Sequence, residues 1–508
     1  MKTRLKICSG VLAAAVLMPG YAMAAKYTST TDTGVDVLDY IENQHRAERE
    51  NRLNDDQKKL LKDTAEMKQH LRQPVDPTKI PVAFEGDDLT YDQKSGAFEA
   101  KGNVVITQLD DRRFTSDKMD GNSKTQDIRV EDQGHVLQLT PNVPRVDLNG
   151  YRINYNYGKK TGTMEDAKGK VDHQYVTGKR FEFYPDEVII YNGTATKCAA
   201  KKPDYHLSAD KIEIFPGKKM IMYNVKVYLG SVVLYQQKKR EVDISPEAKE
   251  TIYPRAGYDK DDGVWVEQTF DTVLAPKVTG YADLKYMSKW GVRNVYGVDW
   301  ANAGSSYHLK YGYFEDSNNH WIKKEPTFVY NYGHQIGKGP FSYTFEYELG
   351  RWYNNGVHST HSYYNLTVSR APLALGHGFV LFFDTGYSIT KESYDKSTVK
   401  GFSYNATVGK EFSKRFVGFL GYHYTATNSQ RTLFNYNVDD YSRKLETGFS
   451  YRFDDKNRIV AGWNYDMSAK SLKDVDYYWY HDIHCAEVII RYRAKRHTWG
   501  IGFQFTPW

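Results

Sequence analysis

The chain ends on Gly500-Ile501-Gly502-Phe503-Gln504-Phe505-Thr506-Pro507-Trp508, and this stretch decides the class of fold. Apolar side chains occupy alternate positions, at Trp499, Ile501, Phe503 and Phe505. A period of two is typical of a β-strand with one face in an apolar medium. A last strand of this kind, ending on an aromatic residue, is typical of β-barrels that close in a bilayer. We therefore expect a transmembrane β-barrel at the C-terminal side of the chain.

The first 24 residues have the pattern of a secretory signal peptide. A basic start at residues 1–6 is followed by a mostly apolar run at residues 7–19 and by Ala22-Met23-Ala24, a small-x-small cleavage signal. Cys8 lies inside the apolar run, so we expect it to be absent from the mature protein. The pattern predicts export.

The composition agrees with a barrel. Mean hydropathy is −0.67, yet the chain contains 42 Tyr, 23 Phe and 9 Trp. After the signal peptide we find no apolar run near the roughly 20 residues of a membrane helix. In a barrel only alternate residues face lipid, so hydropathy averages out. The alternative is a large secreted β-protein that is rich in tyrosine.

The net charge of +6 is modest, and its charges are interspersed. This distribution does not indicate nucleic-acid binding. A mild positive bias suits an anionic lipid or glycolipid.

Residues 25–79 are highly charged and lack strand alternation. Apolar residues such as Val37, Ile41 and Leu60 have loosely helical spacing, and Pro74 and Pro77 end the pattern. We expect a solvated helical lead-in; the alternative is a helix that docks on a periplasmic partner.

Residues 80–250 contain a weak repeat of short strands. LNGYRIN at 148–154, VTGKRFE at 176–182 and LSADKIE at 207–213 each place a small residue and a polar pair before a short apolar-alternating strand. Strand pairs of this kind cannot bury a face alone. They are expected to stack into an elongated sandwich or roll.

Residues 251–508 have longer, more aromatic strands that keep one parity, for example Phe341-x-Tyr343-x-Phe345-x-Tyr347. Turn signals such as Asn354-Asn355-Gly356 separate them. We count about fourteen candidate strands, which predicts an antiparallel transmembrane barrel of about that size.

Several stretches of the chain, taken in order, resemble the LptD family of outer-membrane lipopolysaccharide-assembly proteins, also called organic-solvent-tolerance proteins. The matching stretches are GTATKC at 193–198, PDYHLSADKI at 203–212, YNVKVYLG at 223–230, PRAGY at 254–258 and HDIHC at 481–485. The resemblance spans roughly residues 80–508. It is specific in the first half and mostly compositional in the barrel half.

The resemblance implies an all-β chain with a periplasmic, OstA-like β-jellyroll followed by the barrel. It implies that lipopolysaccharide moves from a periplasmic jellyroll bridge protein through an apolar interior and leaves the barrel sideways. It also implies contact with the barrel-assembly machinery through the C-terminal strand. Two features differ from the family: the barrel is short, which leaves less room for the usual lipoprotein plug, and the charged lead-in is additional.

Carrying acyl chains across water requires an apolar groove, because each exposed CH₂ costs about 0.8 kcal/mol. Each candidate taken alone is equally compatible with ordinary core. The candidate groove residues are Leu89, Phe98, Met119, Ile128, Ile153, Phe181, Ile190, Ile212, Ile214 and Met220.

Two cysteines remain after the expected cleavage, Cys198 and Cys485. An even count in an oxidising compartment is compatible with a disulfide, with two unpaired thiols or with an intermolecular bond. Interdomain disulfides at matching places in the family favour a Cys198–Cys485 bridge. His481, His484 and Cys485 form an incomplete set of metal ligands, so we predict no metal site.

Lateral release needs a weak seam where the first and last strands meet. Proline lacks the N–H that a sheet needs and marks strand edges. Pro254 and Pro276 are expected to flank the first barrel strand, and Pro507 to lie in the last. We therefore predict that the barrel opens at this place.

The leading hypothesis is a non-enzymatic glycolipid translocon without a cofactor. The second is a passive, porin-like channel with a periplasmic domain. The third is an outer-membrane hydrolase; the chain has no G-x-S-x-G or H-E-x-x-H motif, and this function would need a Ser–His pair on one strand face.

Overall fold

The computed structural model describes residues 33–50, 52–70, 82–141, 143, 145–200, 202–216, 218–244, 254–302, 304–315, 321–427, 434, 441–483 and 485–505. The expected signal peptide, with Cys8, therefore lies outside the described residues. The same holds for His484 and Pro507.

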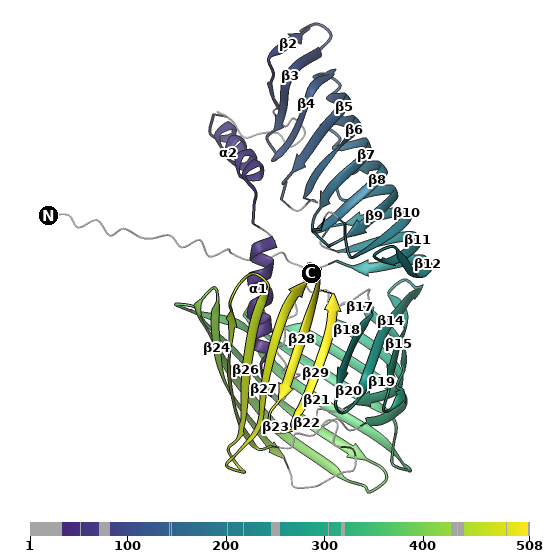
Figure 1. Cartoon of the computed structure of the whole chain (residues 1–508), viewed down its shortest axis with the longest axis vertical. Helices are drawn as coiled ribbons and strands as arrows, with labels where there is room; N and C mark the ends of the chain where they lie inside the picture. The colour runs from purple at the N-terminus through teal and green to yellow at the C-terminus, as the bar shows by residue number, and fades with distance from the viewer. Residues whose placement is uncertain are drawn as a thin grey trace, which may run out of the picture.

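Two helices precede an N-terminal sheet and a closed barrel (Figure 1). The helices are α1 (Asp36–Glu50) and α2 (Asp55–His70). Neither of them is long and apolar enough to span a bilayer.

The N-terminal sheet has twelve strands, and each later strand pairs antiparallel with its neighbour along the chain. This order is a meander, and no Greek-key crossing of a jelly roll occurs among the described strands. Short turns allow each hairpin to form locally. The strands are β1 Val82–Glu85, β2 Asp88–Tyr91, β3 Ala97–Gln108, β4 Arg112–Asn122, β5 Asp127–Gln138, β6 Val146–Asn156, β7 Thr161–Val171, β8 Gln174–Phe183, β9 Val188–Thr196, β10 Tyr205–Phe215, β11 Lys219–Leu229 and β12 Val232–Asp243.

Most long strands of this sheet bend near their middle. The pairing register shifts there in β3, β5 and β6, and Asn103, Arg152 and Asn192 take positive φ angles of 46°, 47° and 47°. In β10 the buried parity changes at the bend, from Leu207 to Ile212. Both halves of the strands therefore contribute to one buried apolar cluster, and the sheet folds over itself.

The bend explains the sequence repeat. Gly150, Gly178 and Ala209 lie inside β6, β8 and β10, not before a strand as the pattern suggested. A Cβ at Gly178 would overlap the Ile190 side chain. A small residue is needed because the chain approaches its neighbour closely where the sheet turns over.

The barrel is closed and has sixteen strands, because β16 and β17 both pair with β15 and form one interrupted strand. The expectation of about fourteen is wrong. The segment between Pro254 and Pro276, taken as one strand, contains two.

The barrel elements have the following bounds: β13 Arg255–Asp259, β14 Gly263–Ala275, β15 Val278–Met287, β16 Gly291–Val292, β17 Val295–Asn302, β18 Ser305–Glu315, β19 Trp321–Gln335, β20 Phe341–Asn354, β21 Val357–Gly376, β22 Phe379–Glu392, β23 Thr398–Ser413, β24 Phe416–Thr427, β25 Arg443–Arg452, β26 Asn457–Asp466, β27 Ser471–Ile483, β28 Ala486–Arg493 and β29 Thr498–Phe505.

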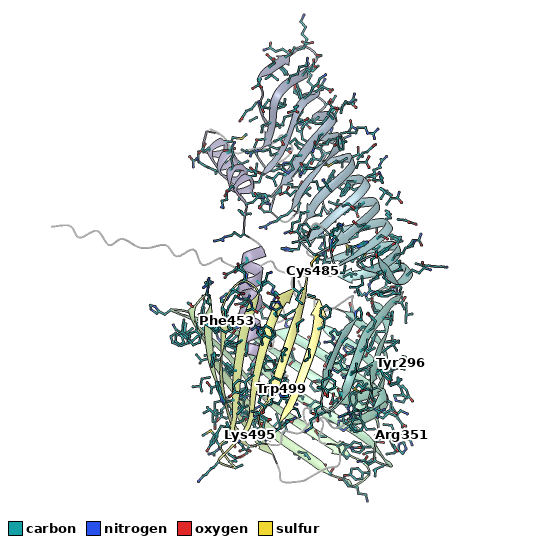
Figure 2. The ribbon with its side chains drawn as sticks, in the orientation of Figure 1. Tyr296, Arg351, Phe453, Cys485, Lys495 and Trp499 are labelled. Atoms are coloured by element: carbon teal, nitrogen blue, oxygen red, sulfur yellow. A yellow bond between two sulfur atoms is a disulfide. The ribbon has the colours of Figure 1, made fainter. Side chains whose placement is uncertain are left out.

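The outer face of the barrel is apolar. In β29, Trp499, Ile501 and Phe503 are 56%, 49% and 37% exposed, as the alternation of the last strand predicted. Figure 2 shows Trp499 and Tyr296 on the wall, with Phe453 towards the N-terminal sheet and Lys495 at the far end. Exposed apolar side chains around a closed barrel with an even strand number indicate that it spans a membrane.

The lead-in is helical, as expected, and most of α2 is exposed to solvent, but one face of α1 and one narrow face of α2 are buried. Val37 and Leu38 of α1 are 0% and 1% exposed, and Leu60 of α2 is 0% exposed. Figure 1 shows α1 running into the barrel and α2 beside the N-terminal sheet. The charged composition concealed these two narrow apolar faces.

The turn between β7 and β8 carries Asp172, whose carboxyl group is largely buried. Burial raises the pKa of Asp172 to about 6, although the N–H of Arg145 donates to its Oδ1 (2.9 Å). Its Oδ2 is buried and accepts no hydrogen bond from the described residues. Ionisation of this group therefore opposes folding at neutral pH.

We predict that Asp172→Asn stabilises the N-terminal sheet at neutral pH. The folded pKa lies above the value of about 3.9 in the unfolded chain, so stability present below about pH 4 is lost as the pH rises towards about 6. The variant should gain up to about 3 kcal/mol at neutral pH and nothing at acidic pH. Urea unfolding of the detergent-solubilised chain, followed by pulse proteolysis, measures this difference; a variant less stable at neutral pH would contradict it.

Candidate functional site at the joint between sheet and barrel

Nine of the ten predicted groove residues share one wall of the folded N-terminal sheet. Each is 5% exposed or less and belongs to the same apolar cluster. Leu89 is the exception, because it lies in β2 and is 51% exposed. The nine are Phe98, Met119, Ile128, Ile153, Phe181, Ile190, Ile212, Ile214 and Met220.

Cross-strand pairing joins these residues into a continuous stripe. Phe181 pairs with Ile190, and Ile190 with Ile212. Ile214 pairs with Met220 one strand further. The stripe therefore runs across the strands towards β11. It lies on one side of the bend in each strand, the side that holds the groove residues predicted from the sequence.

The groove residues predicted from the sequence include none from the opposite wall of the folded sheet. That wall carries Val104, Phe114, Leu148, Val176 and Val227, which belong to the same cluster. These residues stand on the other side of each bend, where the parity of burial changes. Reading the alternation separately on both sides of each small residue would have found them.

The two walls pack directly against each other, as the side chains of an ordinary core do. Backbone hydrogen bonds join neighbouring strands within each wall, whereas the walls meet through apolar side chains. A lipid chain could enter only if the walls separate. The free edges of the sheet are β1 and β2 at one end and β12 at the other.

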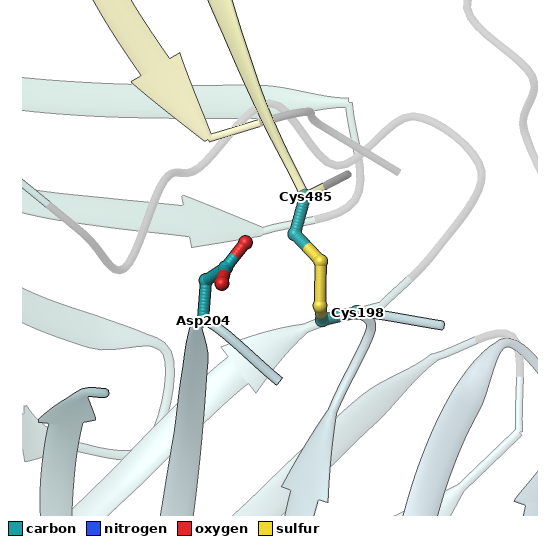
Figure 3. A group of neighbouring side chains, drawn as sticks. All are labelled: Cys198, Asp204 and Cys485. Carbon is teal, nitrogen blue, oxygen red and sulfur yellow. A yellow bond between two sulfur atoms is a disulfide. The ribbon is translucent and has the colours of Figure 1, made fainter. Parts of the chain in front are cut away.

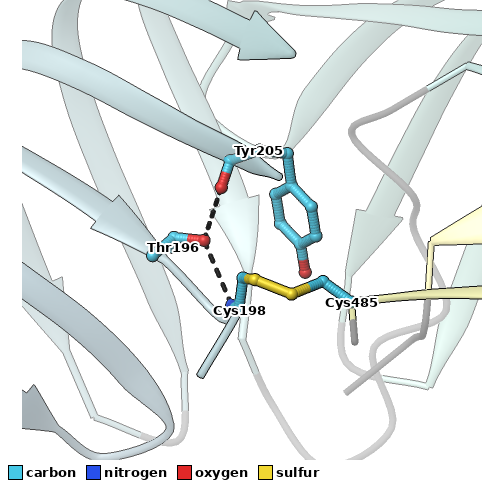
Figure 4. Close-up of a disulfide and its surroundings, with 4 residues drawn as sticks. All are labelled: Thr196, Cys198, Tyr205 and Cys485. Carbon is cyan, nitrogen blue, oxygen red and sulfur yellow. Dashed lines mark hydrogen bonds between the residues drawn. A yellow bond between two sulfur atoms is a disulfide. The ribbon is translucent and has the colours of Figure 1, made fainter. Parts of the chain in front are cut away.

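The sheet is joined to the barrel by the Cys198–Cys485 disulfide, with a Cα–Cα distance of 5.1 Å. This confirms the predicted bridge over the free or intermolecular thiols. Figure 4 shows that the Thr196 hydroxyl donates to the Tyr205 carbonyl (2.6 Å) and accepts from the Cys198 N–H (3.1 Å). Cys485 and Ala486 belong to the apolar cluster, so the interior of the sheet reaches β28.

Asp204 lies beside the disulfide (Figure 3). Its carboxylate and the two sulfur atoms lie within 4.8 Å of one another. The disulfide leaves no thiolate to ligate a metal. His481 uses Nδ1 in a hydrogen bond with the Asn457 side chain (2.8 Å) and does not complete a metal site with Cys485.

A second joint connects β12 to β14. Arg240 is 4% exposed and forms an ion pair with Asp271 (3.0 Å). Tyr235 packs edge-on against Phe270, with ring centroids 5.2 Å apart. Gln237 donates to the backbone carbonyl of Asp271 (3.0 Å). Beside this joint, a hollow of about 610 Å³ is lined mainly by apolar residues of β14, β15, β17 and β18.

The barrel closes between β13 and β29 through only four residue pairs, compared with fourteen between β20 and β21. At the seam, Gly257 pairs with Gly502, so no side chains meet there. The disulfide joint lies at β28 and the ion-pair joint at β14. The two attachments of the sheet therefore stand on either side of the weakest pairing that the structure describes in the barrel.

A pocket of about 320 Å³ spans the seam. Its charged lining is mixed, beside several aromatic side chains: the basic residues are Arg255, Arg491 and Arg493, and the acidic residues are Asp259, Asp261, Asp262 and Glu315. Arg491 pairs with the buried Asp476 at 2.6 Å. The pocket next to the shortest strand pairing therefore has charged groups of both signs.

The prolines are only partly as expected. Pro254 directly precedes β13, the strand at the seam. Pro276 follows β14 and not the first strand, because the hairpin of β13 and β14 was taken as one strand. Pro507, the third seam residue, lies outside the described part of the chain.

The structure also brings a serine and a histidine together on one strand face. Ser359 and His361 of β21 both contact Glu392. The Ser359 hydroxyl donates to Glu392 (2.7 Å), so the histidine does not activate it. His361 is 0% exposed and stacks on Trp352, which leaves no approach for a substrate. This arrangement supports a structural role.

No family model and no curated protein matches the chain. Solved structures to which it is similar include a variant of the Rh. blastica porin (9% identity, TM-score 0.31), OmpT of Vibrio cholerae (9%, 0.26) and OccK10 (OpdN) of Pseudomonas aeruginosa (8%, 0.30). Each match covers 50% of this chain and 97%, 94% and 98% of those chains, respectively. Likeness at this level concerns the fold alone.

The chain folds as an outer-membrane β-barrel. This follows from its own sixteen antiparallel strands and their apolar outer face.

We predict that the seam opens more easily than the rest of the barrel. Hydrogen exchange of the detergent-solubilised chain should show peptides of β13 and β29 exchanging at least about tenfold faster than those of β20 and β21. The cause is the small number of strand pairs that must separate. Equal protection across the barrel would contradict a weak seam.

Proposed function

We propose that the chain is a glycolipid translocon of the outer membrane, which accepts lipopolysaccharide in its N-terminal sheet and releases it through the barrel seam. One observation carries this proposal: the apolar interior of the sheet ends at the barrel between two joints that flank the seam. On this proposal the N-terminal sheet lies in the periplasm.

The apolar stripe supports transport of acyl chains. Moving a chain from water into this interior recovers about 0.8 kcal/mol for each CH₂. The cost is the separation of two walls that meet through side chains. Since no hydrogen-bonded ladder joins the walls among the strands that the structure describes, the sheet can widen without losing their pairing.

The seam pocket supports passage of a charged, polar headgroup. Such a group would meet Arg255, Arg491 and Arg493, each of which already pairs with a carboxylate, together with acidic side chains of the same pocket. An acyl chain on the lipid side would meet the apolar hollow over β14, β15, β17 and β18. A molecule with a charged head and apolar tails fits these two surfaces on one bilayer-spanning wall.

The free edge formed by β1 and β2 is the part of the sheet farthest from the barrel along the strand order. Its unpaired backbone groups suit strand addition by a periplasmic bridge protein. We also propose that the barrel-assembly machinery inserts this barrel into the outer membrane by binding its C-terminal strand.

A passive porin-like channel is the second candidate. A closed sixteen-stranded barrel is wide enough to leave an aqueous lumen, which favours it. The helix inside the barrel and the long apolar interior of the sheet favour the translocon instead.

Photocrosslinking distinguishes the two functions. A photoreactive phenylalanine analogue at Phe98 or Phe181, inside the sheet, should crosslink to lipopolysaccharide in growing cells. The same analogue at Tyr151 or Tyr184, which are 46% and 40% exposed, is the matched control. Equal yields at all four positions, or none at the interior positions, would exclude the apolar route.

Locking the seam tests lateral release. Tyr258 and Ile501 are directly paired and both face outwards, so Tyr258→Cys with Ile501→Cys should crosslink the seam. We expect newly exported lipopolysaccharide at the cell surface to fall at least about tenfold, the size of effect expected when a gating step is blocked. The control is Phe402→Cys with Ala426→Cys, an outward pair on β23 and β24 that should have no effect. Normal export through a locked seam would refute release at this place.

A further inference from the structure

The α1 helix fits the inner wall of the barrel through an apolar face. Val35, directly before the helix, is 1% exposed, and Leu38 and Ile41 of the helix are 1% and 5% exposed. They form one cluster with residues of β22, β24, β26 and β27, including Phe382, Val417, Phe419, Val460 and Tyr480. All of these wall residues belong to the parity opposite the exposed outer face, so the helix lies in the lumen.

Ion pairs fix the helix in place: acidic residues of α1 bind arginines of the wall, and a basic residue of α1 faces a glutamate of the wall. Asp39 binds Arg458 at 2.6 Å and Glu42 binds Arg452 at 2.8 Å. On the basic side of α1, Arg46 approaches Glu487 at 3.7 Å. On the wall, Arg458, Arg452 and Glu487 are 4%, 8% and 5% exposed, respectively. The helix that buries these charges also supplies their partners of opposite sign, so this wall and α1 are complementary.

Two further contacts lie towards the last turn of α1. His45 lies 2.9 Å from Glu411, and Glu48 lies 3.0 Å from Lys414. The contacts of α1 thus extend from β22 to β28. The helix ties together the wall that leads to the seam strand β29.

The start of the helix also adjoins the seam pocket. The Thr33 hydroxyl donates to Asp476 (3.4 Å), the carboxylate that binds Arg491 of the pocket. Tyr478 belongs to the α1 cluster and lines the pocket as well. A molecule passing from the lumen to the seam would meet α1.

The second helix is fixed to the N-terminal sheet. The Thr64 hydroxyl donates to Asp111 (2.6 Å), and Asp63 pairs with Arg113 (2.5 Å). The Gln57 amide donates to Asp147 (3.4 Å). The contacts involve β4, β6 and the turn before β4, so α2 rests on the domain that would receive the cargo.

The connection between the helices is short. Residues 51–54 span at most about 14 Å when extended, whereas fifteen helical residues are about 22 Å long. The α1 helix therefore cannot clear the lumen while α2 stays on the sheet.

We propose that α1 is a built-in plug that closes the barrel, and that its release requires α2 to leave the N-terminal sheet. Separation of the sheet walls by cargo would thereby be coupled to opening of the lumen. The plug makes a separate lipoprotein in this part of the lumen unnecessary. The coupling to cargo rests on the proposed translocon function, whereas closure of the lumen does not.

Conductance of the full chain in planar bilayers tests the plug without any glycolipid. Asp39→Arg with Glu42→Arg places two like charges against Arg458 and Arg452, and single-channel conductance should rise several-fold over the parent chain. Asn43→Arg with Gln44→Arg introduces the same two side chains at exposed positions of the same helix and should leave conductance unchanged. A parent chain that already conducts as an open sixteen-stranded pore, or an unchanged double variant with an intact heat-modifiable barrel, would overturn the plug.

Crosslinking α2 tests the coupling. Thr64→Cys with Asp111→Cys, joined by a short bis-maleimide in the Asp39→Arg, Glu42→Arg background, should return conductance towards the parent value. The same four-site variant without crosslinker is the control and should stay open. If the crosslinked chain conducts as freely as the control, release of α1 does not depend on α2. The two proposals can fail separately. If the conductance results are as expected but cells depleted of the protein still carry normal amounts of surface lipopolysaccharide, the plug stands and the translocon function is rejected.

Discussion

The Cys198–Cys485 bond is the constraint on which the rest of the structure depends. It holds the end of the apolar interior against the turn before β28, one strand away from the last strand of the barrel. The Arg240–Asp271 pair fixes the other side at β14. Because one attachment is covalent and the other is a buried ion pair, the sheet is held in register with the seam between them.

The seam is weak for a geometric reason. The strand β13 has five residues and pairs with β29 at four positions, whereas strands on the far side of the barrel have fourteen to twenty residues. Each missing pair removes backbone hydrogen bonds that would otherwise resist separation. Placing the shortest strand directly after the sheet puts the easiest opening where the apolar interior ends.

Electrostatics in the lumen complement this arrangement. The wall carries arginine and glutamate side chains that pair with opposite charges of α1. The helix buries these charges and supplies partners for them at the same time. The same helix is connected through α2 to the sheet, which links the state of one domain to that of the other.

Much of the secondary structure could be predicted from local pattern. Alternation in Trp499, Ile501 and Phe503 identified the outer face of the last strand, and the apolar positions from Phe98 to Met220 identified one wall of the sheet. The strand count was too low in part because the hairpin of β13 and β14, between Pro254 and Pro276, was taken as one strand. The second wall was missed because each bend changes the parity of burial.

By itself the sequence determined the β-architecture, the apolar outer face and the availability of two cysteines, because these depend on residues a few positions apart. Only the tertiary structure decided that α1 lies in the lumen, that α2 rests on the sheet and that the two joints flank the seam. Asp39 and Arg458 are 419 residues apart, and their pairing leaves no local period. Such contacts arise from how closed sheets bring distant charges together, so they appear only once the chain is folded.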